Sequence, residues 1–424
     1  MRSTASRILI RLAIAVAIAS VFATWMWVRR ERRQTPYRLG VVAALTGKAA
    51  DRDAPTANAV AAAVDVLNAG GGISGHPVEM VIRDSRGDEA TAASEARRLV
   101  EGGVGILIAG AGAGSRRAIE GAIAPLGGLV LSPHAGEGLD DSPSLITFGT
   151  LPNQRAVPAA AWAVRACGPK LYLVANEGLT QRTVSAILHD HVPCIGGTIV
   201  GESWCSGEPA DLARVAAEIR DARPNAIISG LDRTSSLALA AELVSIGVTP
   251  ASVPTVAWQL RAADLERADA KLVDGNYLVA SSFFAEDEDL GPELATAYAV
   301  RSSGARPDAR AIAAAAAVRM LADAMSRCGG VDATSVRAAL LGAMIPRGGK
   351  PFVIDSATQC AWLPSRVGKI GRAGDGSMRV ETTWSSDGPI RPQPWPVWRS
   401  RTEWDEFVRR GGKPVPAMAA ESAK

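Results

Sequence analysis

The chain has 424 residues, 47% of them hydrophobic and 21% charged, which is enough to bury two cores and too long for one simple domain. Its formal net charge of +3 is spread over scattered arginines and acids, and aromatic residues make up 5%. Such a sequence offers neither a basic stripe nor stacking platforms for a nucleic acid. We therefore expect two lobes and exclude nucleic acid as a partner.

The amino terminus carries an uncharged apolar stretch, Leu12 to Val28, with arginines on both sides. At 1.5 Å per residue this stretch covers roughly 25 Å, slightly less than a ~30 Å hydrocarbon core. Residues 21–23 offer a small-residue cleavage site, but the apolar run continues beyond them to Val28. We expect residues 1–36 to form a signal anchor or signal peptide with a basic linker. The body would then lie at the periplasmic face of the inner membrane, or free in the periplasm after cleavage.

From Tyr37 onward, strand and helix patterns alternate and then repeat. The first series is Tyr37–Ala44, Thr56–Ala69, Val78–Arg83, Glu89–Glu101 and Gly105–Ala109, beginning and ending with a strand. The second series begins with a helix and runs Val157–Arg165, Leu171–Ala175, Arg182–His189, Thr198–Ser203, Ala210–Asp221 and Ala226–Ser229. Such alternation predicts two parallel α/β units.

The stretch "GILIAGAGAGSRRAIEGAI", Gly105 to Ile123, predicts a strand, a loop of glycine and alanine, and a helix. Loops of this kind can hold an anion with their backbone N–H groups. A P-loop requires Lys-Ser or Lys-Thr after its last glycine, whereas Gly114 is followed by Ser115 and Arg116. The dinucleotide fingerprint fails as well, because Ser115 occupies the place of its third glycine. Ser115 as a simple helix N-cap is the structural alternative.

Further helices are expected after Ser229, and short strands follow Pro351. The helices are Ser235–Ile246, Gly291–Ser302 and Asp308–Met325, with a strand near Tyr277–Ser281. The tail beyond Gly411 is rich in Lys, Pro, Ala and Ser, which favours disorder.

Several segments resemble type I periplasmic solute-binding proteins. "YRLGVVAALTGKAA" and "NAVAAAVDVLNAGGGISGHPVEMVIRDSRGDEATAASEARRLV" resemble the opening of that family, and "LPNQRAVPAAAWAV", "LTQRTVSAIL", "GVTPASVP" and "GPIRPQPWP" resemble its urea and short-chain-amide-binding branch. The resemblance implies two doubly wound parallel-sheet lobes joined by three crossovers, near Pro152, Phe284 and Gly342. Lobe 1 would comprise residues 37–152 and 285–342, and lobe 2 residues 153–284 and 343–398. Residues 399–424 would form a partly disordered extension.

The resemblance also implies a ligand cleft at the carboxyl ends of the strands. The residues that it places there are Thr46, Gly110, Gly112, Gly114, Ser115, His134 and Glu177. Other ligand contacts of the family are absent. Two tyrosines are replaced by Ser132 and Gly136, an Asp-Tyr pair by Glu177 and Gly178, and a later Glu and Tyr by Ala313 and Ala316. An unmatched buried amide group costs about 1 to 3 kcal/mol, so a tight urea site is not expected.

We therefore expect an exported solute-binding protein that closes two lobes on a small polar molecule for an ABC permease. The alternative is a membrane-tethered sensor that reports to a signalling protein, or a scaffold of the same fold that has lost its ligand. No G-x-S-x-G elbow and no Cys/His signature is present, so we expect no enzyme, cofactor or metal. His189 and His191, two apart on a helix, point to different sides.

An exported chain can form disulfides, and this one has five cysteines. Cys167 and Cys194 each precede a strand by about four residues, and successive strands of a doubly wound sheet are usually neighbours. We therefore predict a Cys167–Cys194 bridge at the edge of lobe 2 away from the cleft. Cys328 and Cys360 are a weaker second pair, which leaves Cys205 as the odd thiol.

Overall fold

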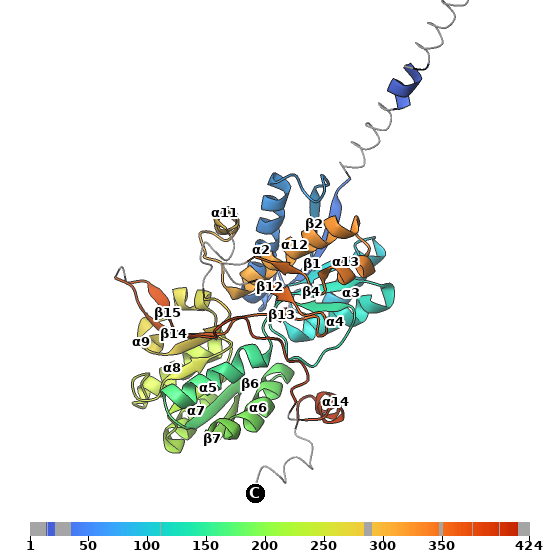
Figure 1. Ribbon diagram of the computed structural model, residues 1–424. Helices are drawn as coiled ribbons and strands as arrows, with labels where there is room; N and C mark the ends of the chain where they lie inside the picture. Colours follow the sequence, from blue (N-terminus) through green and yellow to red (C-terminus); the bar gives the residue numbers. More distant parts are fainter. Residues whose placement is uncertain are drawn as a thin grey trace, which may run out of the picture.

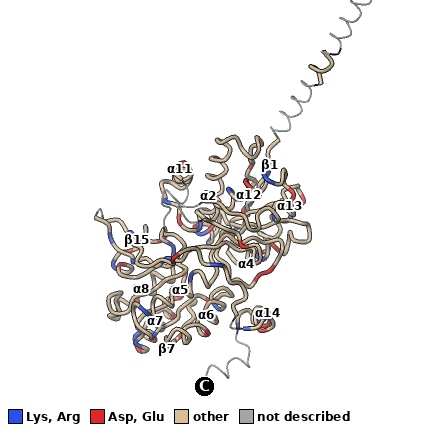
Figure 2. Tube along the Cα trace, viewed as in Figure 1, with Lys and Arg blue, Asp and Glu red and all other residues tan. Residues whose placement is uncertain are grey.

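The computed structural model describes residues 14, 16–21, 35–110, 112–283, 291–346, 351–374, 376–397 and 399–413. Figure 1 shows two α/β lobes, one above the other, each built around its own sheet. Figure 2 shows Lys and Arg mixed with Asp and Glu over both lobes. Neither lobe is coloured by one type of charge alone. A site with mainly positive side chains is therefore a property of that site and not of a whole lobe.

Lobe 1 contains a five-stranded parallel sheet with the order β2-β1-β3-β4-β5. Its strands are β1 (Tyr37–Ala43), β2 (Val78–Asp84), β3 (Ile106–Ala109), β4 (Leu129–Ser132) and β5 (Leu145–Thr147). Its helices are α2 (Ala50–Ala69), α3 (Glu89–Glu101), α4 (Ala113–Ile123), α11 (Pro292–Arg301), α12 (Ala309–Cys328) and α13 (Ala333–Leu340). Successive strand residues enter opposite cores: Val41 packs with α2 and α12, and Val42 packs with α3 and α4.

Lobe 2 contains a seven-stranded sheet with the order β15-β14-β10-β9-β8-β6-β7. Its parallel strands are β6 (Lys170–Asn176), β7 (Thr198–Cys205), β8 (Ala226–Gly230), β9 (Thr255–Ala257) and β10 (Tyr277–Ala280). The strands β14 (Arg366–Arg372) and β15 (Met378–Ser385) join antiparallel. Its helices are α5 (Ala156–Ala166), α6 (Leu179–His191), α7 (Pro209–Ala222), α8 (Arg233–Ser245) and α9 (Ala270–Val273).

The last change of lobe comes later in the chain than predicted. The first change of lobe lies between β5 and α5, and the second lies between β10 and α11. Phe284, near which the second crossover was predicted, lies outside the described residues. After Gly342 the strands β11 (Met344–Ile345), β12 (Phe352–Ile354) and β13 (Ala361–Trp362) form a small antiparallel sheet. Phe352 is buried in the lobe 1 core and stacks on Phe148 at 5.9 Å between ring centroids. These apolar side chains keep the segment in lobe 1 until Leu363, so the predicted crossover near Gly342 is wrong.

The C-terminal extension contains an ordered helix, α14 (Arg401–Arg409), where we expected partial disorder. A capping box of Ser400 and Glu403 begins it, and Trp404 is fully buried. Trp404 and Phe407 form one apolar cluster with Leu139 of lobe 1 and Ile187 of lobe 2. In Figure 1 the C-terminal segment passes the boundary between the lobes and ends at α14. Residues 414–424 lie outside the described part of the chain.

The predicted disulfide is absent, since all five cysteines are free thiols in the structure. The strand adjacency behind that prediction is confirmed, because β6 and β7 pair in parallel with Lys170 opposite Thr198. The two side chains nevertheless lie in different surroundings. Cys167 is half-buried against the lobe 2 core, whereas Cys194 is exposed and its thiol donates to the Asp190 carbonyl at 3.4 Å.

The predicted signal peptide or anchor, Leu12 to Val28, falls mostly outside the described residues. Positions 14 and 16–21 are described, and they are helical and exposed. Across the described part of the chain, no helix has both the length and the apolar character needed to cross a membrane.

Candidate functional site

Two adjoining cavities lie between the lobes, at the carboxyl ends of the strands. The larger has a volume of about 650 Å³, and the smaller, of about 70 Å³, lies where the chain changes lobe. Four residues line both of them: Ala135, Arg155, Gln259 and Arg310. The cavities are therefore two parts of one inter-lobe cleft, which we call the cleft from here on.

The glycine loop makes room for charged side chains of the cleft. Gly112 is the N-cap of α4, and a Cβ there would lie 3.2 Å from the Arg52 guanidinium carbon. A Cβ at Gly114 would overlap the Glu89 carboxylate. A larger residue at either position would therefore displace a charged group from the wall of the cleft.

Three predicted site residues line the cleft: Gly112, Gly114 and His134. Gly110 lies beneath it, with its N–H donating to the Val42 carbonyl at 2.9 Å. Ser115 is buried within α4, is not its N-cap, and is not among the lining residues of either cavity.

Thr46 and Glu177 also lie away from the walls of the two cavities. The Thr46 hydroxyl donates to Asp84 at 2.7 Å, at the end of β2. The Glu177 carboxylate accepts hydrogen bonds from Arg182 at 2.6 to 2.9 Å. These two polar groups are therefore engaged by partners within their own lobes.

His134 is 4% exposed and faces the larger part of the cleft. Burial, together with the charges of Arg310 and Arg52, holds the pKa of its imidazole well below the usual 6.5. A hydrogen bond to the Gly110 carbonyl opposes this shift without reversing it. The ring is therefore neutral at pH 7 and can donate a hydrogen bond without adding charge.

Arg155 is the first of two arginines that were not predicted and that dominate the cleft. It is 9% exposed and precedes α5, where the chain enters lobe 2. Its guanidinium carbon lies 4.9 Å from the centroid of the Trp258 ring, and its Nε is buried without a hydrogen-bond partner. No described carboxylate forms an ion pair with it. Burial and the charge of Arg310 lower the pKa of Arg155 to about 9, so it stays charged at neutral pH.

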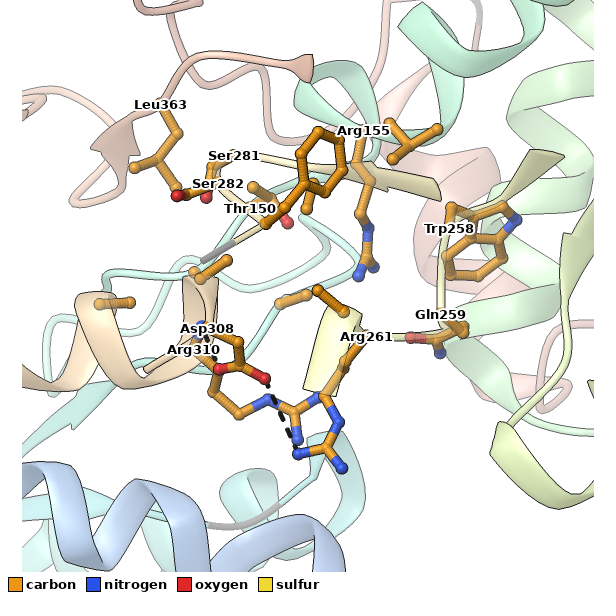
Figure 3. A pocket seen from close by; sticks show the side chains of 18 of the residues that line it. Thr150, Arg155, Trp258, Gln259, Arg261, Ser281, Ser282, Asp308, Arg310 and Leu363 are labelled. Carbon is orange, nitrogen blue, oxygen red and sulfur yellow. Dashed lines mark hydrogen bonds and ion pairs between the residues drawn. The ribbon is translucent and has the colours of Figure 1, made fainter. Parts of the chain in front are cut away.

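Arg310 reaches the same space from the first turn of α12 in lobe 1. Its Nη1 donates to the Arg52 carbonyl at 3.1 Å, and no carboxylate of the described chain forms an ion pair with its guanidinium. Burial and the charge of Arg261 lower the pKa of Arg310 to about 10. The charges of Asp308 and Asp53 oppose this lowering. Arg155, Arg261 and Arg310 line the smaller cavity, and Figure 3 shows that they come from three different segments. The two lobes therefore face each other with two arginines that form no direct ion pair with a described carboxylate.

The other cleft arginines have acidic partners. Arg52 donates to the fully buried Asp53 at 2.7 Å. Arg261 pairs with Asp264 at 2.6 Å and lies 3.9 Å from Asp308. Arg117 is paired with the buried carboxylate of Glu137.

Sequence reasoning identified the loop and the lobe boundary but missed the cationic lining. Arg155 lies inside "LPNQRAVPAAAWAV", the motif expected at the first crossover, and its position at a lobe boundary was a usable signal. Arg310 follows Asp308, which caps α12 by accepting from the N–H groups of Arg310 and Ala311. That cap predicts a side chain at the helix start, near the carboxyl ends of the strands.

Comparison with known proteins identifies the architecture. The sequence model of a family described as "Periplasmic binding protein domain" matches residues 37–401. A solute-binding protein of an ABC transporter from Rhodopseudomonas palustris BisB5, solved with 3,4-dihydroxybenzoic acid, has a TM-score of 0.74 at 17% identity, covering 84% of this chain and 99% of its own. A branched-chain amino acid transporter substrate-binding protein from Streptococcus pneumoniae, solved with isoleucine, has a TM-score of 0.71 at 16% identity, covering 82% and 99%.

A third structure with the same fold comes from another organism. It is an ABC transporter substrate-binding protein from Sphaerobacter thermophilus, with a TM-score of 0.72 at 20% identity, covering 84% of this chain and 99% of its own. Identities this low establish a shared fold and leave the ligand to the chemistry of the cleft.

Proposed function

This chain belongs to the periplasmic binding protein family, whose model matches residues 37–401, and on that premise we propose that it binds a small carboxylate between its lobes. The bound solute would be presented to an ABC permease in the inner membrane. The apolar segment near the amino terminus would direct export, as an anchor or as a cleaved signal.

Arg155 is the observation that carries this proposal. An ionised group taken out of water without a partner costs several kcal/mol, and the contact with Trp258 offsets about 0.5 to 2 kcal/mol of that. The remaining cost is explained if an anion completes the site, because a guanidinium matches a carboxylate with two parallel hydrogen bonds. The side chain is 9% exposed and borders both parts of the cleft.

The charge of the cleft favours an anion over the urea or short-chain amide that the sequence resemblance indicated. A neutral amide would leave the guanidiniums of Arg155 and Arg310 uncompensated. The relatives solved with 3,4-dihydroxybenzoic acid and with isoleucine each hold a molecule that contains a carboxylate, which supports the same reading. The neutral groups of His134 and Gln259 add hydrogen bonding without opposing the charge.

A thermal-shift panel tests this proposal on the exported body, residues 35–413. Benzoate, 4-hydroxybenzoate, isoleucine and aliphatic carboxylates should include at least one stabiliser, because a ligand at 100 times its Kd adds about 2.7 kcal/mol. Urea and acetamide at the same concentrations should leave Tm unchanged. Stabilisation by urea alone would refute the proposal, and a panel without any stabiliser would favour the ligand-free scaffold.

A further inference from the structure

The lining of the cleft is strongly unequal in charge. Five arginines and two acids, Glu89 and Asp308, border the two cavities in the described part of the chain. Three of the arginines lie against acids, as described above. Arg155 and Arg310 are the two whose guanidiniums form no ion pair with any described carboxylate.

These two guanidiniums come from opposite sides of the cleft. Arg155 stands at the beginning of lobe 2, before α5, and Arg310 stands in the first turn of α12 in lobe 1. Both border the same two cavities, and in Figure 3 Arg155 lies on the side of Trp258 whereas Arg310 lies on the side of Asp308. At such a site a single carboxylate would leave one of the two charges unmatched.

Among the groups around them, the buried Asp308 is the acid that competes with an anion, since its charge raises the pKa of Arg310. His134 and Gln259 are neutral, and Glu89 is an exposed residue reaching the loop at Gly114. Asp308 uses one oxygen to cap α12 and keeps the other 3.9 Å from Arg261, where it has no hydrogen bond. That second oxygen is the acceptor available to an ammonium group of a ligand.

We propose that the solute is a small dicarboxylate, with one carboxylate on Arg155 of lobe 2 and the other on Arg310 of lobe 1. This inference rests on the proposed function and specifies its ligand. A dianion between the two lobes would replace the repulsion between like charges by two charge-assisted pairs, and it would thereby couple binding to closure. Two classes of ligand have the required pair of carboxylates, plain dicarboxylates and amino dicarboxylates. Only an amino dicarboxylate has an ammonium group that could donate to Asp308 Oδ2.

Isothermal titration of the full chain separates these cases. The probes are succinate, glutarate and adipate, the amino dicarboxylates aspartate and glutamate, and the monocarboxylates butyrate, valerate and benzoate. We expect the best dicarboxylate to bind about 10 to 100 times more tightly than a monocarboxylate of equal length, as one added charge-assisted hydrogen-bonded pair implies. Glutamate binding better than glutarate would indicate an ammonium on Asp308; the reverse would indicate a plain dicarboxylate.

Two variants and two matched controls test the assignment of the residues. Arg155→Gln and Arg310→Gln should each weaken dicarboxylate binding about 10 to 100 times, and only one of them should weaken monocarboxylate binding. Arg165→Gln on α5 and Arg319→Gln on α12, both at exposed positions, should bind like the wild type. Ligand-free Tm checks folding, and Arg155→Gln should not lower it, because it removes a buried unpaired charge.

The results of these experiments distinguish the dicarboxylate inference from the proposed carboxylate-binding function. Equal affinity for monocarboxylates and dicarboxylates would overturn the dicarboxylate and leave the carboxylate-binding function standing. Dicarboxylate binding that survives both arginine variants would overturn the residue assignment. The absence of binding by every carboxylate would overturn the function itself.

Discussion

His134 shows at the scale of one residue how the cleft is kept free of additional charge. Its ring is 4% exposed, and its Nε2 lies 3.4 Å from the Thr56 hydroxyl. Burial comes first among the causes that lower its pKa, followed by Arg310 and Arg52. The folded protein therefore holds a neutral imidazole at a pH where the unfolded chain would already take up a proton.

This difference predicts an acid-side loss of stability. The folded pKa is below the unfolded value of 6.5, so the stabilisation is fully present above pH 6.5 and is lost as the pH falls below it. Between pH 7 and pH 5.5 this single group should cost about 1 kcal/mol of unfolding free energy. Urea denaturation of His134→Gln should show a smaller loss than the wild type over that interval. The control His76→Gln replaces a histidine that lines neither cavity. Equal slopes for His134→Gln and wild type would contradict the assignment.

Single residues also show what the sequence could and could not predict about the site. The place of the cleft followed from the family resemblance, together with the rule that α/β sheets present ligands at the carboxyl ends of their strands. The glycines of the loop were found for the same reason, although their role is to accommodate Arg52 and Glu89. Arg155 and Arg310 were missed because an arginine beside a helix start looks the same in sequence whether it faces solvent or another lobe. Burial and the absence of an acid partner become visible only in three dimensions.

At the scale of elements, nearly all of α14 lies after residue 401, where the match to the family model ends. The segment from Arg399 to the end of the helix contacts both lobes: Arg401, in α14, pairs with Asp141 of lobe 1 at 2.8 Å, and Arg399, before the helix, pairs with Asp190 of lobe 2 at 2.8 Å. The indole of Trp404 donates to the Pro396 carbonyl at 2.9 Å. The helix therefore fastens the end of the chain across the lobe boundary, mainly through buried aromatic surface.

Removal of the Trp404 side chain should therefore destabilise the protein measurably. Replacing a fully buried tryptophan by alanine typically costs about 3 to 5 kcal/mol. Chemical denaturation of Trp404→Ala, compared with the exposed control Arg409→Ala on the same helix, measures the effect. A change below about 1 kcal/mol, together with early proteolytic cleavage before residue 400, would show that α14 unfolds separately from the body.

The elements themselves differ in how well the sequence predicted them. The long alternating units of both lobes were predicted correctly because their apolar periodicity is strong. The strands β11 to β13 were assigned to the wrong lobe, since two or three residues carry no signal for the core that they join. The helix α14 was missed because it has only a few apolar residues, and Trp404 and Phe407 find their partners in distant segments.

At the scale of the whole molecule, two lobes connected by three crossings enclose a cleft whose walls carry like charge. Arg155 and Arg310 approach it from different lobes, and the charge of Arg310 contributes to the lowered pKa of Arg155. Such an arrangement opposes closure without a ligand and favours it with an anion, which is the coupling that a solute-binding protein needs.

Small-angle X-ray scattering on residues 35–413 tests this account most directly. The radius of gyration should decrease when the carboxylate that stabilises the wild type is added at saturation, and it should stay constant with the same concentration of urea. Arg155→Gln should show no contraction at the concentration that saturates the wild type, whereas Arg165→Gln should contract normally. A carboxylate that raises Tm without any contraction, or an equal contraction in Arg155→Gln, would contradict binding of an anion between the lobes through Arg155.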